Sequence, residues 1–228
     1  MILRTILGRR LLGTAVIAVH NPSDLVEDHK DAQRIIGIHK RLSEGKGLLP
    51  PAIGFLFDRE CRTQEQIEKL LKNFEGTGVR RDRVKFLRRR MYENYLLHVG
   101  AIAAVLKELG KPATKSKISQ QINQALDNSA FKEWVKDKPG GKSSAATEQW
   151  LERKPRDYFR DVPKNAGKTL ETIHAADVLG DIFAKAGLSY RKVEDDVLLT
   201  RWLLKNDPDH LREIADLLGE LLPSETHT

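Results

Sequence analysis

The chain has 228 residues, of which 40% are hydrophobic and 31% are charged, and its formal net charge is +7. This length fits one large domain or two small ones with a hydrophobic core, and the positive charge favours an acidic partner such as nucleic acid, the alternative being an ordinary basic surface. The single cysteine, Cys61, excludes an internal disulfide and fits a reducing, cytoplasmic compartment. No apolar run is long enough to cross a bilayer, so no membrane role is expected.

The first half of the chain alternates amphipathic segments, typical of helices, with short apolar runs, typical of strands covered on both faces. In chain order the pattern predicts a helix over 2–12, a strand over 15–19, a helix over 23–44, a strand over 52–57, a helix over 63–76, a strand over 83–87 and a helix over 93–109. Such alternation predicts a parallel sheet with covering helices. Right-handed crossovers then place the carboxyl ends of the strands at one edge.

The second half contains few strand signals. Helices are predicted over 117–136, 145–153, 169–186, 197–204 and 208–222, with a loop over 139–144. We therefore expect an α/β fold, with a parallel sheet flanked by helices in residues 1–110 and an α-helical C-terminal subdomain in residues 111–228.

An acidic pair follows the predicted strand over 52–57. Side chains alternate along a strand, so Asp58 and Glu60 are expected to point the same way and Arg59 the other way. Two neighbouring carboxylates repel each other unless a cation lies between them, and Mg²⁺ prefers such oxygen ligands. The alternative is a strand that ends in an ordinary polar turn.

A third acid and three arginines follow the next predicted strand. Glu93 comes soon after the run Arg88, Arg89 and Arg90, at the edge where the acidic pair is expected. Carboxylates that hold a metal beside guanidinium groups fit phosphodiester chemistry, because the metal polarises the phosphoryl group and arginine pairs with phosphate oxygens. The alternative is a solvated basic turn, with Glu93 complementing a helix dipole.

Aromatic and histidine side chains offer weaker candidates. Tyr92 and Tyr95 flank Glu93 and are placed to stack on bases, although their helical spacing is more typical of a core. His174 and Trp202 are expected to pack inside the helical half.

Three segments, taken together, resemble the Toprim nuclease domain of the overcoming-lysogenization-defect (OLD) family. They are Phe55-Leu56-Phe57-Asp58-Arg59-Glu60, Val84-Lys85-Phe86-Leu87 and Arg90-Met91-Tyr92-Glu93-Asn94-Tyr95-Leu96-Leu97. In that family the first motif usually reads Asp-Arg-Asp and the last Arg-x-Ile/Leu-Glu-Asn-Tyr-Leu-Leu. The family's helical tail is similar to further parts of the chain: residues 172–179, Phe183, residues 190–192 and residues 208–218. The resemblance therefore covers nearly the whole chain.

The resemblance implies a metal-dependent DNA nuclease of the kind that is joined to an ABC-type ATPase and often serves in defence against phages. It implies that Asp58, Glu60 and Glu93 are the catalytic, metal-binding acids for Mg²⁺ or Mn²⁺. Glu60 stands where the family usually has aspartate, which keeps the charge and lengthens the side chain. The arginine run over 88–90 is then expected to contact the DNA backbone.

Two departures from the family pattern bear on activity. A Toprim sheet usually begins with a strand that ends in a catalytic Glu-Gly motif, whereas this chain opens with a segment that resembles the helix after it. The segments Gly141-Lys142-Ser143 and Gly167-Lys168-Thr169 lack the first glycine of a P-loop, so no ATPase is expected here. We therefore expect the C-terminal piece of a longer nuclease, with weak or no cleavage by this chain alone and with strand edges open to pairing with a second copy.

The family also uses a lysine in a His-Gly-Lys context within the C-terminal helices. Here the matching segment reads His174-Ala175-Ala176, so neither Lys168 nor Lys192 is assigned that role. The alternative function is non-enzymatic: a nucleic-acid-binding or regulatory protein that associates with an ATPase through its helical half. A third hypothesis is that the chain is an α/β phosphotransferase or phosphatase.

Overall fold

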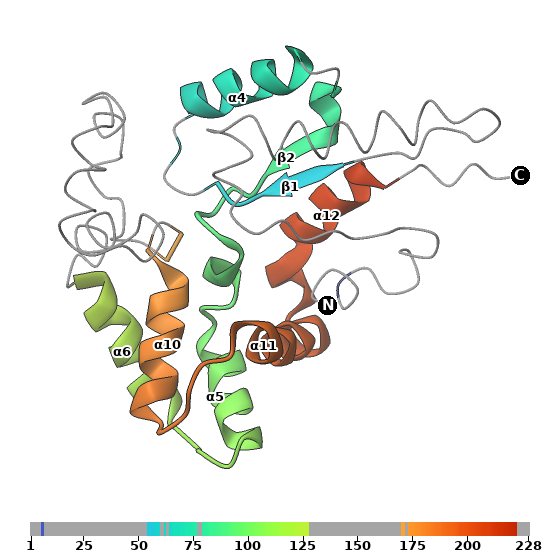
Figure 1. Ribbon diagram of the computed structural model, residues 1–228. Coiled ribbons are helices and arrows are strands. Elements are labelled where there is room, and N and C mark those ends of the chain that lie inside the picture. Colours follow the sequence, from blue (N-terminus) through green and yellow to red (C-terminus); the bar gives the residue numbers. More distant parts are fainter. Residues whose placement is uncertain are drawn as a thin grey trace, which may run out of the picture.

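The computed structural model of the chain describes residues 6, 54–59, 62, 64–76, 79–127, 170–171 and 173–222. The described part is mixed α/β: helices predominate, and two strands form a small parallel sheet (Figure 1). The predicted strand over 15–19 and the predicted helices over 23–44 and 145–153 lie outside these residues, as does all but residue 6 of the helix over 2–12. None of the described helices is long and apolar enough to span a membrane.

The sheet joins two strands that the sequence predicts. Strand β1 (Phe55–Phe57) pairs in parallel with β2 (Val84–Phe86), and Phe55 lies opposite Val84. Helix α4 (Gln64–Gly76) connects the strands and is followed by the short 3₁₀ helix η2 (Arg81–Arg83).

Helix α4 covers one face of the sheet. Its buried residues Ile67, Leu71 and Phe74 recur at helical spacing and pack with Phe57 and Val84 in one hydrophobic cluster. The ring centroids of Phe57 and Phe74 are 5.7 Å apart. Because both predicted strands and the helix between them are present, the β-α-β unit expected from the alternating pattern is confirmed.

Helix α12 (Arg212–Leu221) lies on a different side of the sheet from α4 (Figure 1). A Cβ at Gly54 would be 3.0 Å from the Leu221 side chain, so α12 approaches β1 closely. The Arg83 guanidinium donates to the Leu221 carbonyl at 3.1 Å, and Lys85 forms an ion pair with Glu220. The C-terminal end of the chain thus supports the sheet.

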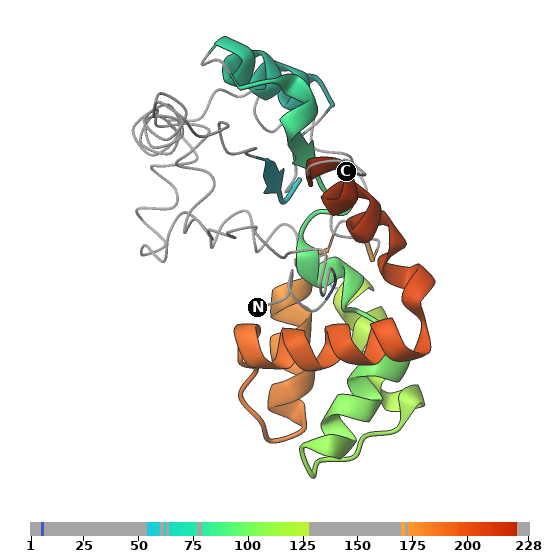
Figure 2. The ribbon, with the colours of Figure 1, turned by 90° about the vertical axis from the view of Figure 1, so that its right-hand side faces the viewer.

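The remaining elements form a helical body (Figure 2). They are the 3₁₀ helix η3 (Tyr92–Tyr95), α5 (Val99–Glu108), α6 (Lys115–Asp127), α10 (Ala175–Lys185), α11 (Lys192–Asn206) and the 3₁₀ helix η4 (Pro208–Leu211). Helix α5 packs against α6 and α11, and α10 packs against α6 and η3. One hydrophobic core joins these helices, and residues on both sides of position 110, such as Leu106 and Phe183, are fully buried in it.

The helix predicted over 93–109 is divided into η3 and α5. His98 lies before α5 in an extended backbone conformation, and its Nδ1 accepts a hydrogen bond from the Ala101 N–H at 3.1 Å. This side chain caps the first turn of α5, so the helix begins after His98 instead of continuing from Glu93.

Helix α11 is longer than the predicted helix over 197–204. Its first turn is stabilised by Asp195, whose Oδ2 accepts a hydrogen bond from the Arg191 N–H at 2.6 Å. A carboxylate that reaches back to the amide before the first turn satisfies a donor that the helix leaves open, which moves the helix start to Lys192.

Candidate functional site

Asp58 lies directly after β1, at the carboxyl edge of the sheet. Its Oδ1 accepts a hydrogen bond from the Tyr92 N–H at 2.9 Å. The chain reaches Tyr92 from the end of β2, where the Leu87 N–H donates to the Phe57 carbonyl at 2.9 Å. The two strand ends are therefore joined, and Asp58 is attached to the 3₁₀ helix that carries Glu93.

Glu93 is a buried acid with a lysine partner. Its side chain is 1% exposed, and its Oε1 lies 2.5 Å from Nζ of Lys192, whose side chain is 65% exposed. Partial burial lowers the pKa of Lys192, but the negative charges of Glu93, Asp58 and Asp196 outweigh it and raise that pKa above the ordinary value. Three carboxylates therefore act on one ammonium group: one directly after β1, one on η3 and one on α11.

Asp196 lies one turn after Lys192 on α11 and is 1% exposed. It accepts a hydrogen bond from the Tyr190 hydroxyl. Burial raises the pKa of Asp196 to about 7, and the charges of Glu93 and Asp195 add to this shift. The hydrogen bond from Tyr190 and the positive charge of Lys192 oppose it. The site thus contains an acid that titrates near neutral pH.

Tyr92 connects the Glu93 turn to α11. Its hydroxyl lies 2.6 Å from Oγ1 of Thr200, and that Oγ1 donates to the Asp196 carbonyl at 2.6 Å. The Tyr92 hydroxyl is consequently the donor to Thr200. Burial raises the pKa of Tyr92, so the phenol stays protonated and keeps this connection over the physiological pH range.

The structure brings together two of the three predicted metal-binding acids. Asp58 and Glu93 act on the same ammonium group, whereas Glu60 lies outside the described residues. Within the part of the chain that the structure describes, no three His, Cys, Asp or Glu side chains form a metal-binding group. Asp58 and Glu93 still provide the hard oxygen donors that suit Mg²⁺, which commonly takes one or two carboxylates together with substrate phosphates.

The three predicted DNA-contacting arginines differ in exposure. Arg88 is exposed. Arg89 donates from its guanidinium to the Asn94 carbonyl at 3.0 Å and lies 4.3 Å from the centroid of the Tyr95 ring. Arg90 is 2% exposed. Of the three arginines, Arg88 alone therefore fits the alternative of a solvated basic turn. Arg89 contacts neighbouring residues of the fold, and Arg90 is buried.

Tyr95, His174 and Trp202 pack within the fold, as expected from the sequence. Tyr95 is 1% exposed, and its hydroxyl donates to Glu213 Oε1 at 2.6 Å. His174 is 4% exposed. The Trp202 and His98 rings pack with centroids 5.4 Å apart.

Sequence reasoning missed the contribution of α11 to the site. Lys192, Asp196 and Thr200 recur every four residues, which places them on one helix face. This spacing, with the acid Asp196 inside an otherwise apolar helical segment, was the available signal. A buried acid needs a polar or charged partner, so such a segment is expected to contact one. Comparison with protein-family models, curated proteins and solved structures gives no match for this chain.

Proposed function

We propose that this chain is a metal-dependent DNA endonuclease domain of the Toprim type, similar to that of the OLD family. The observation that carries the proposal is the position of Asp58 and Glu93. They follow neighbouring parallel strands and both act electrostatically on the Lys192 ammonium group. A cation is therefore favoured at the carboxyl edge of the sheet, where open parallel sheets bind their ligands.

In this proposal Asp58 and Glu93 hold Mg²⁺ or Mn²⁺, and Glu60 adds a third carboxylate from the sequence motif. When bound, the ion would polarise the phosphoryl group and activate a water molecule for attack on it. The Tyr92 N–H fixes the rotation of the Asp58 carboxylate, because it occupies one of the two oxygens at 2.9 Å. Because Glu93 is buried, water screens the charge of its carboxylate less than it would at the surface.

Lys192 is the group that we propose for the phosphate. Its long side chain is 65% exposed, so the ammonium can move from Glu93 to an incoming DNA phosphate, which would leave the Glu93 carboxylate available to hold a metal. The sequence motif does not give Lys192 this role; its contact with Glu93 and its exposure support it. Arg88 is the exposed arginine that we propose for contact with the backbone.

A specific observation also favours the non-catalytic alternative. Lys192 already compensates the buried charge of Glu93, so this ion pair is complete without a metal. In that case the basic chain binds nucleic acid through salt-dependent phosphate contacts and needs no divalent ion.

Calorimetric titration with Mn²⁺ tests the proposal. We expect the wild-type protein to bind Mn²⁺ and the variants Asp58→Asn and Glu93→Gln to bind it at least about tenfold more weakly, because each loses a charged ligand. Glu194→Gln is the matched control, because it removes an exposed charge from α11 in the same way. Nicking of supercoiled plasmid with Mn²⁺ is measured in parallel, and Asp58→Asn should abolish any cleavage found.

Two results would contradict the proposal. One is Mn²⁺ binding that is the same in all three variants and the wild type. The other is salt-dependent duplex binding by a protein that binds no Mn²⁺, which would establish the non-catalytic alternative.

A further inference from the structure

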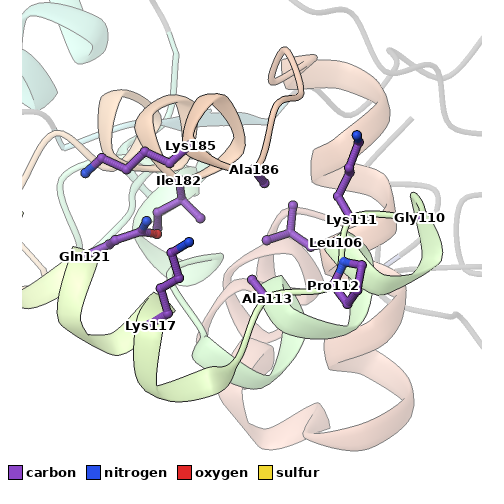
Figure 3. A pocket seen from close by; sticks show the side chains of 10 residues that line it. All are labelled: Leu106, Gly110, Lys111, Pro112, Ala113, Lys117, Gln121, Ile182, Lys185 and Ala186. Atoms are coloured by element: carbon purple, nitrogen blue, oxygen red, sulfur yellow. The ribbon is translucent and has the colours of Figure 1, made fainter.

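A cavity of about 280 Å³ lies where the loop between α5 and α6 meets α10. Leu106 and Ile182, both buried, form part of its wall. Lys117 and Gln121 extend from α6 toward α10, and Lys185 extends from α10 on the same side of the cavity (Figure 3). None of the residues that line the cavity belongs to the candidate metal site.

The charged side chains among the described residues that line this cavity are all positive. Lys111, Lys117 and Lys185 line it, and no acidic residue is found among the described residues of its wall. Among the described residues, none of these three ammonium groups has an ion-pair partner. Like charges around one concave surface repel each other, so the cavity attracts an anion.

The position of Lys117 strengthens this argument. Lys185 lies in the last turn of α10, and Lys111 follows the end of α5, where the helix dipole favours a cation. Lys117 lies in the first turn of α6, where Thr114 Oγ1 accepts the Lys117 N–H at 3.2 Å and marks the helix start. The dipole disfavours a cation there, and no acid in the first turn of α6 offsets it. An external anion would supply the missing negative charge.

We propose that this cavity binds a phosphate-bearing ligand. Lys117 and Lys185 provide ammonium groups for the phosphate oxygens, and the amide of Gln121, which lines the same cavity, provides a neutral donor. The volume of about 280 Å³ lies at the lower limit for small-molecule sites, so it suits one or two phosphate groups and is too small for a dinucleotide. The proposal does not depend on the nuclease function, because it involves neither the acids nor a metal.

Calorimetric titration with inorganic pyrophosphate, in buffer without divalent cations, tests this inference. We expect Lys117→Gln combined with Lys185→Gln to weaken binding at least about tenfold, because both charge-assisted contacts are lost. The matched control combines Lys69→Gln and Lys72→Gln, which removes the same charge from exposed positions on α4. Lys192→Gln is a second control and shows whether pyrophosphate binds at the acidic site instead. All substituted lysines are exposed, so the variants should fold, which circular dichroism checks.

A short DNA duplex, titrated separately and in competition, distinguishes the source of the phosphate. Pyrophosphate binding that depends on Lys117 and Lys185 and is unaffected by duplex indicates a free phosphorylated ligand. Duplex binding that depends on the same two lysines indicates backbone phosphates. The inference is overturned if neither probe depends on these lysines, or if the α4 control loses as much affinity as the cavity variant.

Discussion

Lys192 Nζ lies 2.5 Å from Oε1 of Glu93, so an exposed side chain neutralises a buried one. This pair joins α11 to the 3₁₀ helix that follows β2. In the absence of a metal, Lys192 compensates the charge of Glu93. Its effect on folding can be measured separately from any activity.

Replacing Lys192 with methionine should destabilise the protein. The change leaves the Glu93 carboxylate buried without its cation, and an expected loss on the order of 1–2 kcal/mol follows, since exposure of the lysine moderates the effect. Urea denaturation measures it. In the double variant Lys192→Met with Glu93→Gln, the neutral amide needs no cation, so most of the loss should be recovered. Additive losses would show that the two side chains do not interact.

Asp196→Asn should stabilise the protein at alkaline pH. The folded-state pKa of Asp196 is about 7, above its ordinary value of 3.8, because the carboxyl is buried near Glu93 and Asp195. The folded protein therefore retains the proton longer than the unfolded chain, and stability falls as the pH rises from about 4 to about 7. Asparagine keeps an acceptor for the Tyr190 hydroxyl and cannot ionise. The melting temperature of the variant should exceed that of the wild type at pH 8 and approach it at pH 4, and an equal difference at both would contradict this reasoning.

His210 should produce the opposite dependence on pH. Burial lowers the pKa of His210, the nearby Arg89 and His98 lower it further, and its Nε2 lies 2.8 Å from the Tyr95 carbonyl. The folded state therefore disfavours the protonated ring, so its contribution to stability is present above pH 6.5 and is lost as the pH falls below that value. His210→Gln removes this titration and keeps a donor. The stability gap between wild type and variant should narrow from pH 8 to pH 5 in thermal denaturation, and a constant gap would contradict the assignment.

The sheet and its connecting helix were predictable because their signals are local. Phe55–Phe57 belongs to a short apolar run, Val84–Phe86 is a segment of apolar residues around Lys85, and Ile67, Leu71 and Phe74 repeat at helical spacing. The same signals located Asp58 and Glu93 at one sheet edge. The break at His98 was not predicted, because a histidine cap competes with an otherwise continuous helical pattern.

The part of the site that comes from α11 depends on contacts between distant segments. Lys192 follows Glu93 by about a hundred positions, and no local pattern pairs them. Burial of Arg90 was equally hidden, because three consecutive arginines are typical of a solvated turn. Tertiary packing therefore determines which charged side chains remain exposed to solvent, and Arg88 is one of them.

Asn94 connects η3 to the turn before α10, and its loss should be costly. Its Oδ1 accepts the Met91 N–H at 3.0 Å, and its Nδ2 donates to the carbonyls of Leu170 and Ile173 at 2.8 and 2.9 Å. The residue is 1% exposed, so Asn94→Ala leaves the buried Met91 N–H and Ile173 carbonyl without this partner, and we expect a loss of roughly 2–4 kcal/mol in urea denaturation.

The matched control for Asn94 is Asn206→Ala. Asn206 is exposed and donates one hydrogen bond to the Trp202 carbonyl at 2.8 Å, so water can replace its amide and the loss should stay below about 0.5 kcal/mol. Because Asn94 is adjacent to Glu93, the Asn94→Ala variant should also weaken Mn²⁺ binding under conditions in which it remains folded. A destabilised variant that binds Mn²⁺ with unchanged affinity would show that Asn94 supports the fold without positioning the acid.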